Sequence, residues 1–326
     1  MKNELLKVNF AAVGKDIHID VPLSNVAIDF TPTGMIADMI APVVGVPNIS
    51  GSFPTFDRAD TFRVDNTARA QGTEANRVSR NVSSDNFLCK NYALMDGVTI
   101  ENRYNADPIY VQKLFNGGVQ FVKTKLMLDW ENRVATQSTN TANVGSSTAI
   151  GSAWTDYTNS DPLGDCQTAI DNISDAQGIK PNQVTMSEEA WRNFRRNTSV
   201  RNLIFGVDNG GGYPNAAQVA NLLEVDKVLV GGAYKNTGAE GLAESLSQIW
   251  GDHVLFSYTA AAPSIVVPSF MYSFRWETGG IPNMQVERHA FDTKRKVEDF
   301  ELGYYQDEKI AYQGVSFLLT NVTSST

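Results

Sequence analysis

The stretch 107–137 carries the clearest helical pattern in the chain. Asp107 stands where an N-cap would accept a backbone N–H, and Pro108 takes the first helical position, where its missing donor costs nothing. Apolar residues then recur at steps of three and four, which places them along one side of a helix: Val111, Phe115, Val119, Val122, Leu126 and Trp130. Such a helix would be about 45 Å long, and its span of about 30 residues far exceeds the average helix of about 11–12 residues. The fold must therefore be arranged around one long element.

Two adjacent glycines, Gly117 and Gly118, lie near the middle of this stretch. Each costs up to about 1 kcal/mol relative to alanine in a helix interior. The pair therefore predicts either a bend in the helix or a neighbour packed closely against it.

The composition is that of a globular protein, with 42% hydrophobic and 19% charged residues among 326. The formal charge of −9 disfavours coating of nucleic acid through a general positive field. Two cysteines far apart predict no disulfide framework and suit a reducing compartment. No run of 18 apolar residues occurs, and the first twenty residues are interrupted by charges, so we expect neither a membrane span nor a signal peptide.

The segment 1–50 is predicted to be a mostly extended arm, with one or two helical turns at Met35 to Ile40. Prolines at positions 22, 32, 42 and 47 forbid a long helix there. Its apolar residues come in small groups that cannot form a core of their own. We therefore expect this arm to lie along its own domain or along a neighbouring copy of the chain.

Two strand-like segments, 53–64 and 87–100, flank about 22 residues that have almost no apolar side chains. A loop of this length inside a compact domain usually means function or disorder. From position 58 up to Lys90 the basic residues are all arginines, which pair well with carboxylates at protein interfaces: Arg58, Arg63, Arg69, Arg77 and Arg80. Because acidic residues are interspersed, the pattern fits either an arm that reaches another chain or a solvated loop.

A polar stretch near 138–160 separates the long helix from a mixed α/β segment. Asp161 with Pro162, and Ser187, are predicted to begin helices, and Gly178 to end the first of them. Short apolar strand candidates follow these helices. The end of the chain, 283–326, is rich in strand-like segments.

The search for catalytic motifs finds none. The glycines at 210–212 and 231–232 lack the spacing of phosphate-binding loops. The three histidines lie far apart, without HExxH or His-x-His, and His253 is predicted to be a packed residue. Cys166 is expected in the core, and Cys89 has no nearby base. We therefore predict a structural protein, with no catalytic residue, cofactor or metal.

Several stretches, in their order along the chain, resemble the major capsid proteins of tailed bacteriophages, which share the Hong Kong 97-type fold. PTFDRADTFRVDNTARAQGTEANRV and FLCKNYALMDGV resemble the extended loop of this family, and PIYVQKLFNGGVQFVKTKLMLDWENRVA resembles its spine helix. GIKPNQVTMSEEAWRNFRRNTSVRNLI with LLEVDKVLVGGAYKN resembles the axial domain. VEDFELGYYQDEKIAYQGVSFLLTNV resembles the C-terminal return.

The resemblance implies an α+β fold with five parts. These are an N-terminal arm (1–50), an extended loop (51–100), a peripheral domain with the spine helix (101–160), an axial domain (161–282) and strands that return to the peripheral domain (283–326). It also implies hexamers and pentamers that tile an icosahedral virion capsid, assembled in the host cytoplasm. Expected partners are a scaffolding protein, a portal, a possible decoration protein and double-stranded DNA held without sequence-specific contact.

Residue-level expectations follow from the resemblance. The five loop arginines would pair with acidic groups on neighbouring copies, and Gly117–Gly118 would bend when a shell changes shape. Some family members link a loop lysine covalently to an asparagine, but 51–89 contains no lysine, so we expect a non-covalent shell. Some family members also begin with a long helical scaffolding segment that is cleaved off, whereas this chain starts almost directly with the arm. We therefore expect a separate scaffolding protein, unless the sequence is itself a processed or trimmed form. Two alternatives stay open: an encapsulin-type compartment around an enzyme, and a soluble α/β hydrolase or transferase.

Overall fold

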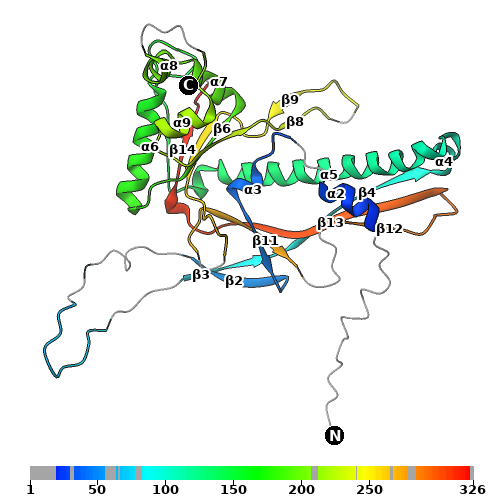
Figure 1. Cartoon of the computed structure of the whole chain (residues 1–326), viewed down its shortest axis with the longest axis horizontal. Coiled ribbons are helices and arrows are strands. Elements are labelled where there is room, and N and C mark those ends of the chain that lie inside the picture. Colours follow the sequence, from blue (N-terminus) through cyan, green and yellow to red (C-terminus); the bar gives the residue numbers. More distant parts are fainter. Residues whose placement is uncertain are drawn as a thin grey trace.

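The computed structural model describes residues 20–29, 33–55, 64, 67–77, 83–206, 212–239, 241–264, 267–277 and 284–323. Figure 1 shows an elongated molecule in which one long helix runs beside a sheet, with a second α/β unit at one end. Two β ribbons project from this body (Figure 1).

The long helix, α5, spans Pro108–Ser138, as the sequence predicts. The predicted apolar residues from Phe115 to Trp130 are buried, and Val111 is partly buried. The prediction of a side-chain cap is wrong, because the Asp107 carboxylate makes no capping hydrogen bond. The carbonyl of Asp107 instead accepts from the backbone N–H groups of Tyr110 and Val111.

A five-stranded sheet packs against α5. Its members are β1 (Val43–Val46), β4 (Lys90–Thr99), β11 (Met271–Trp276), β12 (Gln285–Arg288) and β13 (Val297–Ile310). The long strand β13 pairs with β4 over ten residues and with β11 and β12 along its other edge. Phe115 of α5 meets Phe300 of β13 at a ring-centroid distance of 6.2 Å. The helix is therefore backed by strands from both the middle and the end of the chain.

The N-terminal arm contains a helix that its prolines do not rule out. Helix α2 (Val21–Asp29) packs against α5 and β12, where Leu23 and Ala27 are buried. The short helix α3 (Ala37–Ile40) follows it. The helical turns predicted near 35–40 are confirmed by α3. The prediction of extended chain is wrong over Val21–Asp29, because tertiary burial stabilises a nine-residue helix that has little periodic signal. Residues 1–19 lie outside the described chain.

The predicted hairpin is also built differently. Strand β2 (Ser50–Thr55) pairs with β3 (Ser83–Leu88), and the following β4 turns away to pair with β13. The returning segment 87–100 is thus two strands in two sheets, because its second half is covered by α5 and the end of the chain. Helix α4 (Ile100–Asn105) then leads into α5.

The second unit is built on a sheet in the order β5-β14-β10-β6-β7. Its strands are β5 (Ser146–Ala149), β6 (Gln183–Ser187), β7 (Lys227–Gly231), β10 (His253–Ser257) and β14 (Ser316–Thr320). Its helices are α6 (Pro162–Gln177), α7 (Glu188–Arg196), α8 (Thr198–Phe205) and α9 (Ala216–Leu222). The core between these layers includes Trp154, Phe194 and Phe256, each fully buried.

The predicted caps of this unit are confirmed. The Asp161 side chain accepts from the Gly164 N–H, and the Ser187 hydroxyl accepts from the Ala190 N–H. Gly178 ends α6 with φ of 58°, a left-handed conformation that glycine adopts without a steric cost.

Two strands lie in a different sheet from the one that the predicted domain boundaries imply. Strand β11, inside the expected axial segment 161–282, lies in the sheet beside α5. Strand β14, inside the expected return 283–326, lies in the second sheet. The remaining elements are η1 (Thr141–Asn143), η2 (Gln313–Val315), and the ribbon of β8 (Tyr234–Asn236) and β9 (Leu246–Gln248).

Candidate assembly surface

The ribbon β2–β3 is anchored at its root by aromatic packing. Phe53 and Phe87 lie 4.9 and 4.7 Å from the ring of Phe274 on β11, measured between ring centroids. Beyond this root, the described loop residues 67–77 are all exposed and lie well away from the body (Figure 1). The loop has no core in its own chain, so contacts with other molecules would have to hold it in place.

Two of the five predicted interface arginines, Arg69 and Arg77, lie on this described part of the loop. Both side chains are exposed, and neither forms an ion pair with the described residues. The Arg69 Nε donates to the carbonyl of Thr73, across a turn in which Gly72 has φ of 83°. Arg58, Arg63 and Arg80 lie outside the described residues, so the proposed pairing stays a prediction.

The outer side of α5 carries a second exposed feature, an apolar stripe formed by Tyr110, Leu114, Gly117 and Phe121. Their spacing of four, three and four residues aligns them along the helix. The Tyr110 and Phe121 side chains are 55% and 57% exposed. Lys113 and Lys125 place their ammonium groups 4.8 and 5.1 Å from these two rings. A row of exposed apolar side chains on a long helix is typical of a surface that another molecule covers.

The two glycines of α5 lie in different surroundings. A Cβ on Gly118 would lie 2.6 Å from the Phe300 ring, so a neighbour does pack closely there, as one of the two sequence alternatives predicts. A Cβ on Gly117 would meet nothing within 4 Å, because this residue faces outward on the stripe. The bend proposed for the pair stays a prediction.

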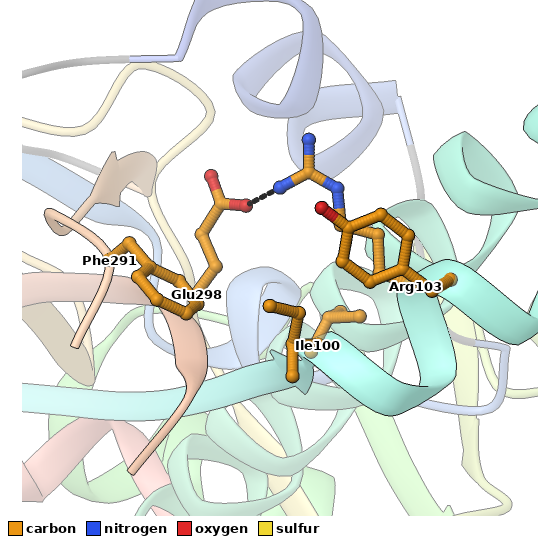
Figure 2. Close-up of a pocket in the computed structure, with 6 residues that line it drawn as sticks. Ile100, Arg103, Phe291 and Glu298 are labelled. Carbon is orange, nitrogen blue, oxygen red and sulfur yellow. Dashed lines mark hydrogen bonds and ion pairs between the residues drawn. The ribbon is translucent and has the colours of Figure 1, made fainter. Parts of the chain in front are cut away.

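A hollow of about 200 Å³ lies at the tip of the molecule, next to α4. Figure 2 shows Arg103 and Glu298 reaching toward one another across it, with a distance of 2.9 Å between Arg103 Nη1 and Glu298 Oε2. Glu298 also pairs with Arg288, which reaches Asp20 at the start of α2. The exposed rings of Tyr104 and Phe291 line the same hollow. An ion-pair chain therefore joins α2, β12, β13 and α4 at this tip.

In the protein interior, Glu131 joins distant segments through hydrogen bonds, a role that the sequence pattern did not predict. This fully buried carboxylate accepts from the backbone N–H groups of Ile36 and Ala37 and from the indole N–H of Trp250. Burial raises its pKa, although the three donors oppose the shift. Glu131 lies beside the apolar row that the sequence predicts, so no local pattern marked it as buried. The hydrogen bonds of Glu131 therefore join α5 to the N-terminal arm and to the connection between β9 and β10.

Both cysteines and His253 have pKa values shifted by burial. Burial raises the pKa of Cys89 to about 11 and that of Cys166 well above its ordinary value, so both thiols stay protonated at neutral pH. Burial lowers the pKa of His253. Across the described residues, no group of three or more His, Cys, Asp and Glu is placed to hold a metal, and no helix is long and apolar enough to cross a membrane.

Comparison with known proteins finds sequences similar to this chain. Residues 120–238 match the model of the family described as phage major capsid protein E. The major capsid protein of Pseudomonas phage JBD67 is 24% identical over 74% of this chain and 77% of its own length.

Solved structures share the fold. A phage-related protein from Bordetella bronchiseptica superposes with a TM-score of 0.73 at 23% identity, covering 94% of this chain and 98% of that one. The capsid of cyanophage P-SCSP1u superposes with a TM-score of 0.59 at 11% identity, covering 90% and 89%.

The chain therefore has a mixed α+β fold of the Hong Kong 97 type. Its segment 120–238 matches the phage major capsid protein E family, and a longer stretch of the chain is similar to a phage major capsid protein.

Proposed function

We propose that copies of this chain form the hexamers and pentamers of an icosahedral phage head that encloses double-stranded DNA. The observation that carries the proposal is the capsid-family match from α5 to β8, on a chain with the Hong Kong 97-type fold over nearly its full length. The exposed loop, the outer stripe of α5 and the tip hollow all gain partners in such a shell. A scaffolding protein, a portal and a decoration protein are the further partners expected.

Electron microscopy of negatively stained, purified protein tests the proposal. We expect shells, tubes or isolated capsomers. Soluble monomers under every condition of salt, pH and concentration would contradict it.

The cargo separates this function from an encapsulin-type compartment. The family match favours a head that encloses DNA. Shells purified from cells that produce the phage should therefore contain nuclease-protected DNA. A co-purifying enzyme in place of DNA would support the compartment.

The shell itself should be held without covalent links between subunits. The stretch 51–89 contains no lysine to provide the amine for such a link. Mature particles boiled in denaturant should therefore run as single subunits of 35.7 kDa. A ladder of multiples of this mass would contradict the expectation.

A further inference from the structure

Two helices of the second unit carry charge of opposite sign. Helix α6 has three acidic residues, Asp165, Asp171 and Asp175, and no basic residue. Helix α7 begins with two acids, Glu188 and Glu189, and the segment 190–206 that follows has four arginines and no acidic residue. Such a separation of charge within one small unit leaves an acidic helix and a basic helix pair exposed to other molecules.

Asp171 and Asp175 on α6 and Arg192 and Arg196 on α7 are exposed and form no ion pair with the described residues. Arg195 is half-buried and forms no ion pair there either. Asp175 lies in the last turn of α6, where the helix dipole disfavours a negative charge. Local stability therefore does not account for this acid.

The arginines are held in place by aromatic rings. The Arg195 guanidinium lies 6.0 Å from the Trp191 ring and 5.4 Å from the Tyr213 ring, and its buried Nε has no acceptor in the described chain. Tyr157 supplies a hydrogen-bond acceptor to Arg196 and raises its pKa. A guanidinium that is stacked and oriented loses less freedom when it meets a carboxylate.

Helices α6 and α7 cover the same face of the sheet, at different ends of the strand order, and α8 contacts both. Helix α6 packs on β14, and α7 packs on β6 and β7, at the other end of the strand order. In Figure 1, α6 runs along one border of the unit and α7 lies toward the β8–β9 ribbon on the other side. A copy placed beside this one can therefore present its acidic helix to the basic helix of its neighbour.

We propose that the α6 face of each copy, through Asp171 and Asp175, docks on the α7 face of the next copy, through Arg192, Arg195 and Arg196. This contact joins two different faces, so it repeats around a ring and closes where the rotation allows. Exposed ion pairs contribute more to encounter and orientation than to affinity. The contact therefore orients neighbours within a capsomer. This inference rests on the proposed function and adds the residues that set the order of copies around the ring.

Charge reversal with compensation tests the pairing. One double variant carries Asp171→Lys with Asp175→Lys, and the other carries Arg192→Glu with Arg196→Glu. Each should keep the unfolding midpoint of the wild type but lower the yield of shells by about tenfold or more. The quadruple variant is the matched control, because it carries all four substitutions and should assemble again.

A mixture of the two double variants gives a sharper result. Rings in which they alternate contain only favourable contacts, so rings with an even number of copies should form and pentamers should not. Normal shells from either double variant, or a folded quadruple variant that does not assemble, would overturn the pairing.

Two further outcomes are distinguishable from these. If a charge reversal prevents folding, the milder pairs Asp171→Asn with Asp175→Asn and Arg192→Gln with Arg196→Gln should still fold and reduce shell yield. A wild-type protein that never assembles would overturn the proposed function, and this inference with it.

Discussion

Glu131 is the residue whose removal should disturb the subunit most. It is a buried carboxylate with three donors from two distant parts of the chain, and no solvent can replace it. A donor left unpaired in a protein interior costs about 1–3 kcal/mol. The same side chain thus holds α3 and the Trp250 region against the middle of α5.

Replacing Glu131 by alanine should lower the free energy of unfolding of the unassembled subunit by about 2–4 kcal/mol, because three buried N–H groups lose their acceptor. Denaturant unfolding measures the change. Asp38→Asn is the control, since it removes an exposed carboxylate from the neighbouring helix α3 and should change stability by about 0.5 kcal/mol at most. Equal effects of the two substitutions would contradict the assignment of Glu131 as a structural node.

The stability that depends on Glu131 should also vary with pH in one direction. Burial raises the pKa of Glu131 in the folded state above its ordinary value of 4.5, so the folded chain holds this proton more tightly than the unfolded chain. The contribution is therefore complete below about pH 4.5 and decreases as the pH rises through the folded-state pKa. The difference in unfolding free energy between wild type and Glu131→Gln, measured from pH 4 to 8, should shrink with rising pH. A difference that grows would refute this sign.

At the scale of elements, α5 combines a buried side that builds the subunit with an exposed side that remains open. Its two glycines lie one on each side. Gly118 faces Phe300, which is fully buried, whereas Gly117 faces outward between Leu114 and Phe121. The pair therefore offers a comparison within a single helix.

Gly117→Ala should raise the free energy of unfolding of the subunit by about 0.5–1 kcal/mol, because alanine is the better helix former and meets no neighbour. Gly118→Ala should lower it by about 1–3 kcal/mol, because its Cβ would overlap the packed Phe300 ring. Thermal or denaturant unfolding of both variants measures the two signs. A stabilising Gly118→Ala would show that the close packing at Phe300 relaxes easily.

The elements that the sequence predicts well are those specified by neighbouring residues. Helices α5 and α6 have apolar spacing and first-turn prolines, and α7 has its Ser187 cap, so their positions follow from local chemistry. The extended loop arginines also stood out, because only composition was needed to find them.

The pairing of strands could not be read in the same way. Phe300 lies opposite Asp96, more than 200 residues away, and nothing near either residue specifies that register. Helix α2 has weak apolar periodicity and is stabilised because Leu23 and Ala27 pack against α5. Glu131 was missed because a single acid within an apolar helix is recognised as buried only once its three donors are known.

At the scale of the whole molecule, the parts that stabilise the subunit and the parts that would join subunits are separate. The cores lie between α5 and its sheet and within the second unit. The β2–β3 ribbon with its loop projects from these cores (Figure 1). A change on the loop should therefore affect assembly without affecting folding.

Arg69→Glu with Arg77→Glu should change the free energy of unfolding by about 0.5 kcal/mol at most, because both side chains are exposed and distant from the cores. Shell formation, followed by light scattering and microscopy, should be strongly impaired. The matched variant Arg69→Lys with Arg77→Lys keeps the charge and loses the planar guanidinium, so it separates charge from bidentate geometry. A normal yield of shells from the glutamate variant would show that these arginines do not contribute to the interface.

The sheet beside α5 also sets the order of events when the chain is made. Val43 of β1 pairs with Ser273 of β11, about 230 residues later. At synthesis rates of roughly 5–20 residues per second, the ribosome needs on the order of 10–45 s to supply that partner. Until then the β1 and β4 edges stay unpaired and the buried side of α5 lacks its cover. A copy therefore cannot complete this sheet until these later strands have been synthesised, and chaperones have this interval in which to keep nascent copies apart.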